Sequence, residues 1–261
     1  MKDILPDKFA TNSNGNENSA ILEVLLLRHT PDPDRLVALA ARRCYSSLPA
    51  SAIDEKLDDA EIDRLLAMLR RRNHLSPFEH ADFTFSVGGV SRALSHQLVR
   101  HRIASYSQES QRYVEYLKRN DLPFVTPPSI KANADAVRIY EKAMKSALEA
   151  YAEMRSVGVP AEDARYVFPN SVETKLVFTM NARSLFNFFE QRLCSKAQWE
   201  IMHLAARMIE VLKPVAPRIF RNAGAPCMYE KPYCREDDPK CLRYPKAINQ
   251  IKPSKGDGSN D

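Results

Sequence analysis

The feature that most constrains the fold is a change of hydrophobic period along the chain. Apolar residues between 60 and 72 recur at helical spacing, with Leu65, Leu66 and Leu69 on one face. Between residues 81 and 87, Ala, Phe, Phe and Val alternate instead with Asp, Thr and Ser, which is typical of a half-buried strand. A chain with both periods has to pack helices against a sheet. The sequence therefore predicts an α+β fold.

Other segments follow one period or the other. We expect a buried strand at 21–29, a strand at 81–87 that ends at Gly88-Gly89, and a strand at 172–180. We expect helices over 33–44, 60–72, 90–102, 132–156, 161–165, 182–193 and 197–212. Because helices predominate, the prediction is a helix-rich single domain around an antiparallel or mixed sheet.

Composition changes at both ends of the 261-residue chain. Residues 1–19 have few apolar side chains and are expected to form a flexible N-terminal arm. Residues 226–261 are dense in Pro, Lys and Asp and are expected to form an irregular C-terminal tail that contains cysteine and proline. Between them we find no linker or repeat, so we expect one domain over 20–225.

Composition also excludes several classes of protein. The longest apolar run, which ends at Leu27, is too short to cross a bilayer, and the first 20 residues lack the apolar core of a signal peptide. We therefore expect a cytoplasmic protein without a membrane partner. The net charge of +5 is mild and both signs are interspersed, which fits a small anionic ligand without requiring one.

Residues 100–113 read Arg-His-Arg-Ile-Ala-Ser-Tyr-Ser-Gln-Glu-Ser-Gln-Arg-Tyr. Three guanidinium groups suit phosphate, and three serine hydroxyls add neutral donors. We interpret this stretch as a binding site for an anionic ligand and not as a fold element.

The first part of this stretch falls at the end of the helix predicted over 90–102. Gln97, Arg100 and His101 would share a face of that helix, whereas Arg102 follows Leu98 by one turn, on the apolar side, and needs a partner there. For one arginine alone, the alternative is a solvated helix end that favours cations.

A second polar segment, His74-Leu75-Ser76-Pro77-Phe78-Glu79-His80, lies at a junction before a strand. Its histidines and glutamate lack a helical ligand spacing, so a zinc site is not expected.

A third polar segment begins at Asn181, a predicted N-cap. Arg183 and Asn187 would share a polar face of the helix that follows. Arg192 would lie beside the apolar stripe, where burying its charge without an anion costs several kcal/mol. A structural salt bridge between Arg192 and Glu190 or another carboxylate is the alternative to a ligand contact.

These three segments, in this order, resemble the flavin-dependent thymidylate synthases, the ThyX family. The spacing Arg100-His101-Arg102, seven residues, then Ser110 is similar to the signature of that family, and the resemblance spans roughly residues 20 to 215. It implies a catalytic domain over 20–225 that makes dTMP from dUMP. It also implies FAD as hydride carrier, 5,10-methylenetetrahydrofolate as carbon donor, NADPH as reductant, and a homotetramer with shared active sites.

The resemblance assigns roles to individual residues. Expected flavin contacts are His74, Ser76, Arg100, His101, Arg102, Gln108, Asn181, Arg183 and Asn187. Expected substrate contacts are Gln97, Arg100, Gln108, Ser110, Gln111, Arg112, Arg165 and Arg192. Arg192 is the expected catalytic residue, because a guanidinium that faces uracil stabilises the anionic base. Some relatives have Glu where this chain has Gln108, with its carboxylate shifted to Glu109, so the charge at that contact stays open.

Five cysteines, an odd number, argue against a disulfide framework. Cys227, Cys234 and Cys241 recur every seven residues among prolines, which exclude a coiled coil. Unliganded thiols and a metal clip completed by Cys44, Cys194 or a histidine are both compatible with the spacing. Because no Cys-x-x-Cys pair or usual zinc spacing is present, we predict free thiols and no metal.

Two other functions are compatible with parts of the sequence. Arg70-Arg71-Arg72 and the central arginines suit a basic nucleic-acid-binding protein, but no aromatic stacking platform accompanies them, so no nucleic-acid partner is expected. A nucleotide transferase without flavin is the other rival. A bound flavin would exclude both.

Overall fold

The computed structural model describes residues 20–114, 116, 122–229, 232–241, 243 and 244. The arm predicted at 1–19 and the tail beyond 244 lie outside these residues. The chain forms two compact units that interleave in sequence: residues 1–28 with 84–179, and residues 29–83 with 180–261. The domain boundaries predicted near 20 and 225 remain predictions.

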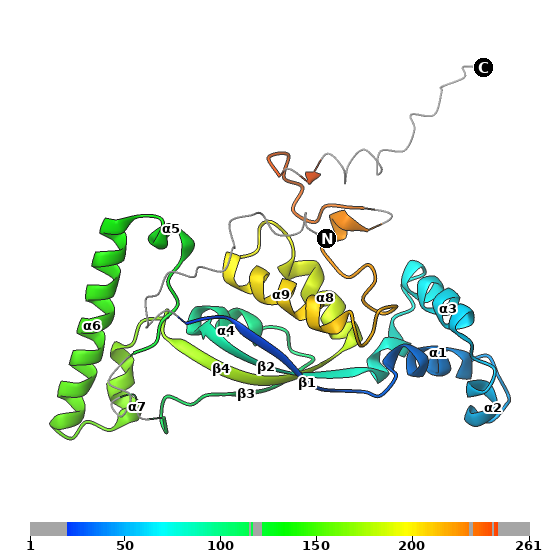
Figure 1. The fold of residues 1–261 in the computed structure, drawn as a ribbon, viewed down its shortest axis with the longest axis horizontal. Helices are drawn as coiled ribbons and strands as arrows, with labels where there is room; N and C mark the ends of the chain where they lie inside the picture. Colours follow the sequence, from blue (N-terminus) through cyan, green and yellow to red (C-terminus); the bar gives the residue numbers. More distant parts are fainter. Residues whose placement is uncertain (1–19, 115, 117–121, 230–231, 242, 245–261) are drawn as a thin grey trace, which may run out of the picture. The chain divides into compact units, whose positions relative to one another are not determined.

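The first unit contains most of a four-stranded sheet in the order β1-β2-β4-β3 (Figure 1). The strands are β1 (Glu23–His29), β2 (Asp82–Ser91), β3 (Ser105–Gln108) and β4 (Glu173–Asn181). β3 and β4 are antiparallel, with Ser105 opposite Thr179 and Gln108 opposite Leu176. Alternate residues turn inward, and Phe85 of β2 stacks on Phe178 of β4 at 5.3 Å between ring centroids. The predicted helix-rich α+β class is confirmed.

β2 does not end at Gly88-Gly89, as predicted, but continues to Ser91. The second of these glycines, Gly89, lies where the backbone of β2 closely approaches the backbone of residues 21 and 22. Gly89 has φ +69°, and a Cβ atom there would lie 1.9 Å from the carbonyl oxygen of Ile21. A glycine is therefore required inside this strand.

β1 forms as predicted, but the expectation that it is buried is wrong. It is an edge strand of the sheet. Val24 is 9% exposed, whereas Leu25 and Leu27, which share the other face, are 47% and 38% exposed. The apolar run at 24–27 thus covers the core with one face only.

The helix predicted over 90–102 is shorter: α4 spans Arg92–Leu98. Its start is defined by the side chain of Ser91, which accepts the backbone N–H of Leu94. The residues that follow turn into β3, so the interpretation of 100–113 as lacking a fold element is wrong. Tyr106 of β3 packs on Phe178 at 5.8 Å. The short alternation of Ser and Tyr was the signal for this strand.

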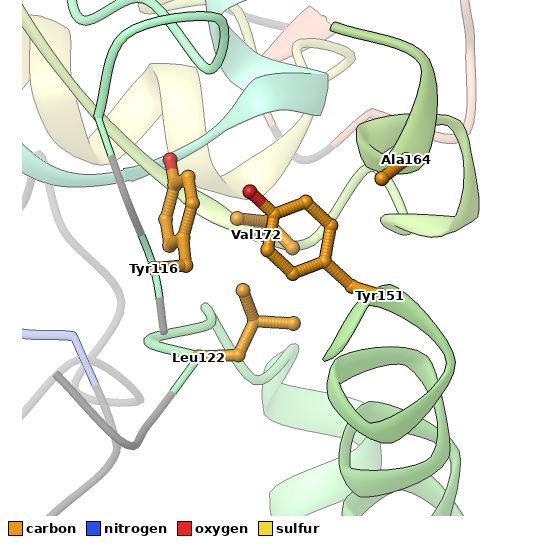
Figure 2. Packing of buried hydrophobic residues seen from close by; sticks show 5 residues of the cluster. All are labelled: Tyr116, Leu122, Tyr151, Ala164 and Val172. Atoms are coloured by element: carbon orange, nitrogen blue, oxygen red, sulfur yellow. The ribbon is translucent and has the colours of Figure 1, made fainter. Parts of the chain in front are cut away.

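The rest of the first unit is α5 (Pro128–Lys131), α6 (Ala134–Ser156), α7 (Ala161–Ala164) and the 3-10 helix η4 (Arg165–Val167). A buried cluster, drawn in Figure 2, joins α6 and α7 to the start of β4 and to the segment after β3. Its members are Tyr116, Leu122, Tyr151, Ala164 and Val172. This packing holds residues 161–167 close to the polar stretch that ends at Tyr113.

The second unit contains α1 (Pro33–Arg43), α2 (Ala50–Asp54), α3 (Asp59–Arg71), the 3-10 helix η2 (Ser76–His80), α8 (Ala182–Arg192), α9 (Trp199–Leu212) and the 3-10 helix η5 (Pro226–Met228). Sequence analysis missed α2. Phe220 anchors the core, with T-shaped contacts to Phe83 at 5.2 Å and Phe186 at 6.0 Å. Over the described residues, no helix is long and apolar enough to span a membrane.

Candidate active site

The Arg-His-Arg motif lies in the turn between α4 and β3 of the first unit. The hydroxyl of Tyr106 donates to the carbonyl oxygens of Leu98 and His101, each at 2.9 Å, and so fixes this turn. His101 is buried, with 8% of its surface exposed. Arg100 and Arg102 are exposed, and neither guanidinium contacts a carboxylate of the residues that the structure describes. The motif therefore presents two cations to solvent around an inward histidine.

This arrangement corrects two expectations about the motif. Only Gln97 is on α4, because the helix ends at Leu98, so Gln97, Arg100 and His101 do not share a helical face. Arg102 was expected on the apolar side and in need of a partner, but it is exposed.

Gln108, on β3, turns its amide into the unit. Its Nε2 lies 3.0 Å from the hydroxyl oxygens of both Ser95 and Thr174, so both N–H groups are used. The carbonyl oxygen Oε1 is the polar atom that remains, and it can only accept a hydrogen bond. Glu109 is also held, by Tyr116 at 3.1 Å and by Lys175 at 3.6 Å.

The next residues belong to a tight turn that follows β3. The Oγ of Ser110 accepts the backbone N–H of Arg112 at 3.3 Å. Gln111 is 9% exposed and its side chain hydrogen bonds to Tyr116. Burial, together with the Glu109 carboxylate, raises the pKa of Tyr116 well above its ordinary value, so this phenol stays protonated.

Glu162 of α7 contacts two of the predicted substrate-binding arginines, Arg112 and Arg165. Its carboxylate accepts from Nε of Arg112 at 2.8 Å, and its backbone carbonyl accepts from Nε of Arg165 at 2.9 Å. Both side chains of the Arg112–Glu162 pair are about half exposed, at 50% and 48%. Two guanidinium groups that are 53 residues apart in the chain thus meet at one glutamate, which sequence analysis did not identify.

The other two polar segments meet in the second unit. The backbone N–H of Ala182 donates to the carbonyl of Ala81 at 2.8 Å, and Phe78 packs on Phe186 at 5.1 Å. Arg183 of α8 forms an ion pair with Glu79 of η2. Helix η2, which begins with the exposed Ser76, and the start of α8 therefore form one surface, and His74 is exposed just before it.

Within α8, Asn181 is the N-cap, as predicted, because its Oδ1 accepts the backbone N–H of Ser184 at 2.9 Å. Asn187 is exposed and accepts from Gln191. Arg192 is the last residue of the helix and is half-buried.

Glu190, the residue named as an alternative partner of Arg192, lies in the same helix. It accepts from the hydroxyl of Tyr229 at 2.8 Å and from Arg235 at 2.6 Å. Its carboxylate thereby connects α8 to the C-terminal tail.

The predicted site residues therefore fall into two groups. The first unit contains the motif at 100–102, the turn at 108–112 and Arg165, and the last two meet at Glu162. The second unit brings together the segments at 74–80 and 181–192. Glu162 was missed, because an acidic side chain gives no local signal for a distant partner. Glu79 was recognised as part of its polar segment, but its pairing with Arg183 was not predicted.

Comparison with known proteins identifies the family of this chain. A family model described as thymidylate synthase complementing protein matches residues 25–218. A flavin-dependent thymidylate synthase of Geobacter sulfurreducens is 50% identical over 207 residues, which cover 79% of this chain and 89% of that protein. A Clostridium tetani enzyme of the same name is 44% identical and covers 79% of this chain and 88% of its own length.

A solved structure is also similar. The UMP/dUMP methylase PolB of Streptomyces cacaoi, bound with 5-Br dUMP, has a TM-score of 0.69 at 27% identity and covers 77% of this chain and 94% of that one. With the fold, the polar segments and the relatives in agreement, this chain belongs to the flavin-dependent thymidylate synthase family.

Proposed function

We propose that this protein makes dTMP from dUMP, with 5,10-methylenetetrahydrofolate as carbon donor, NADPH as reductant and FAD as cofactor. The observation that carries the proposal is the distribution of cations in the first unit. Arg100 and Arg102 are exposed and contact no carboxylate of the described part of the chain, while Arg112 and Arg165 meet at Glu162. Two separate sets of guanidinium groups suit two phosphorylated ligands.

FAD fits the first of these sets. Its diphosphate needs permanently charged donors at the surface, and Arg100 and Arg102 offer them, with His101 in the turn between them. His74, Ser76, Arg183 and Asn187 are exposed polar groups of the second unit, and Asn181 keeps its Nδ2 as a donor after capping α8. When bound, FAD supplies the hydride that reduces the transferred carbon.

The second set suits the nucleotide. We assign Arg112, Arg165 and the Ser110 hydroxyl to the phosphate of dUMP, and Gln97 and Gln111 to further contacts. Arg100 is shared between both ligands. The remaining polar atom of Gln108 is an acceptor, so we assign Gln108 to an N–H group or hydroxyl of either ligand and not to a phosphate.

Arg192 is assigned the catalytic role. A guanidinium across N3 and O4 of uracil stabilises the anionic form of the base and raises the electron density at C5, which attacks the methylene carbon. The half-buried position at the end of α8 supports this role, because partial removal of water strengthens the interaction of the cation with a developing anion.

A homotetramer with shared active sites is part of the proposal. Leu25 and Leu27 are 47% and 38% exposed on one face of β1, and Ile21 before it is 84% exposed. Aliphatic side chains on an edge strand are typical of a surface that another subunit covers. Light scattering on the purified protein measures this directly, and a monomer at working concentration would contradict it.

The deciding experiment is an assay of the purified full chain. We expect the yellow absorbance of a bound flavin, a change in that spectrum on adding dUMP, and dTMP formation that depends on the folate donor and NADPH. Protein that stays colourless after incubation with FAD would overturn the proposal, and would leave the nucleic-acid-binding and flavin-free transferase functions to be tested.

A further inference from the structure

The C-terminal tail brings four of the five cysteines to one place in the second unit. Cys194, which follows α8, Cys227 of η5, and Cys234 and Cys241 of the tail line one small cavity. They are spread over 48 residues of sequence. The fifth, Cys44, is exposed and is not among the residues that line the cavity. Sequence analysis predicted free thiols because the spacing matches no usual zinc motif, but spacing along the chain did not reveal this convergence.

The tail around these thiols has little apolar packing. Of residues 232–241, 243 and 244, only Pro232 is buried. Polar contacts hold this segment beside the end of α8: Lys196 pairs with Asp238 at 2.5 Å, and Arg243 donates to the carbonyl of Leu193 at 3.0 Å. A surface ion pair and a single hydrogen bond to a backbone carbonyl contribute little to stability. A segment without a hydrophobic core usually needs a crosslink or a metal ion to keep one conformation.

The surroundings of Cys241 are those of a metal-binding thiolate. The backbone N–H of Arg243, two residues later, hydrogen bonds to its sulfur, and the hydroxyl of Ser195 lies 3.1 Å from it. The backbone N–H of Tyr244 donates to the carbonyl oxygen of Cys241 at 2.9 Å and closes the turn around the thiol. The side chain of Arg243 also hydrogen bonds to Cys227. Hydrogen bonds to ligand sulfurs and nearby cations offset the charge of a thiolate cluster, as outer-shell groups do in metal sites.

We propose that Cys194, Cys227, Cys234 and Cys241 bind one zinc ion and that this ion anchors the tail to the end of α8. Four thiolates match the tetrahedral coordination of a structural zinc site. The cavity holds about 20 Å³, which is room for one small occupant and not for an iron–sulfur cluster.

Binding requires the thiols to turn toward a common centre. With the side chains as they stand, no three His, Cys, Asp or Glu of the described residues form a group that could hold a metal. Rotation about χ1 moves a sulfur while leaving the backbone in place. Zinc binding releases a proton from each thiol and converts four neutral groups into thiolates attracted to the ion.

The test uses the full-length protein, purified under reducing conditions without chelator. We expect elemental analysis to find one zinc ion per chain, which is released when a mercurial reagent modifies the thiols. Metal-free protein titrated with Co²⁺ should develop the absorption of a tetrahedral thiolate complex. Cys234→Ser should abolish stoichiometric zinc binding, whereas the matched control Cys44→Ser should retain it.

Two results would overturn the proposal: wild-type protein that binds neither zinc nor Co²⁺ with its thiols reduced, or Cys234→Ser protein that keeps a full equivalent of zinc. Disulfides among the four cysteines in protein prepared without oxidant would point to a covalent staple instead. Because the Co²⁺ titration uses the wild-type chain, a variant that fails to fold leaves the test intact. Limited proteolysis adds a structural readout, in which removal of zinc should speed tryptic cleavage after Arg235.

Discussion

Glu162 is predicted to compete with the nucleotide phosphate for Arg112. In the structure its carboxylate already occupies the guanidinium of Arg112, at 2.8 Å, and a phosphate has to take its place. We expect Glu162→Gln to bind dUMP more tightly than the wild type. The amide keeps the shape of the side chain, and the backbone carbonyl that accepts from Arg165 is unchanged.

The size of the effect follows from exposure. Both side chains are about half exposed, so the pair contributes about 0–1 kcal/mol, and removing it lowers the dissociation constant of dUMP by at most about fivefold. Arg112→Ala removes the proposed phosphate ligand itself. It should weaken dUMP binding by about 1.5–3 kcal/mol, roughly 10- to 150-fold, with FAD binding largely kept.

Titration of the flavin spectrum with dUMP measures both effects. Asp163→Asn is the matched control, because it changes the net charge by the same amount at the neighbouring exposed residue, for which the structure gives no contact with Arg112. Weaker dUMP binding in Glu162→Gln would refute the reasoning, since it would mean that the glutamate orients Arg112 for the phosphate. If Asp163→Asn changes the dissociation constant of dUMP by the same factor, the effect comes from the net charge and not from the contact between Glu162 and Arg112.

Three further predictions concern other parts of the chain. Arg192→Lys should fold but lose much of its dTMP formation, because the ammonium group of lysine is a point charge that cannot bind N3 and O4 of uracil together. If turnover and dUMP affinity are unchanged, Arg192 has a structural role only. Asp34→Ala should lower the free energy of unfolding by at least about 2 kcal/mol, because the buried Asp34 carboxylate accepts the backbone N–H groups of residues 218 and 219, each at 3.0 Å. Urea denaturation tests this prediction, with Asp59→Ala, at an exposed ion pair, expected to cost less than about 1 kcal/mol. Burial lowers the pKa of His203 below its ordinary value of 6.5, so below that pH the unfolded chain binds a proton at His203 more readily than the folded chain, and the free energy of unfolding falls. His203→Gln should reduce this loss of stability at acid pH, as measured by urea denaturation. An unchanged dependence of stability on pH would contradict the assignment to His203.

Local patterns in the sequence were sufficient for the elements whose periodicity is long and regular. The helix predicted over 60–72 is α3 (Asp59–Arg71), and the strand predicted at 172–180 is β4 (Glu173–Asn181). Asn181 was predicted as an N-cap because its side chain bonds to the next turn of its own helix. These features depend on neighbours a few residues apart, so the residue order alone specifies them. The three polar segments were found in the same way, and the family followed from their order.

Tertiary structure decided the features that depend on distant residues. α4 ends at Leu98 and not near Arg102. The hydroxyl of Tyr106, in β3, donates to the carbonyl oxygens of Leu98 and His101 and so holds the turn between α4 and β3. Glu162 meets Arg112 because a buried cluster holds α7 beside the segment after β3.

The cysteines show the same limit over a longer distance. Their spacing predicted free thiols, yet Cys194 and the three tail cysteines line one cavity, because the tail folds back beside the end of α8. Such contacts join residues tens of positions apart and depend on how whole elements pack, which the periodicity of a short window cannot encode.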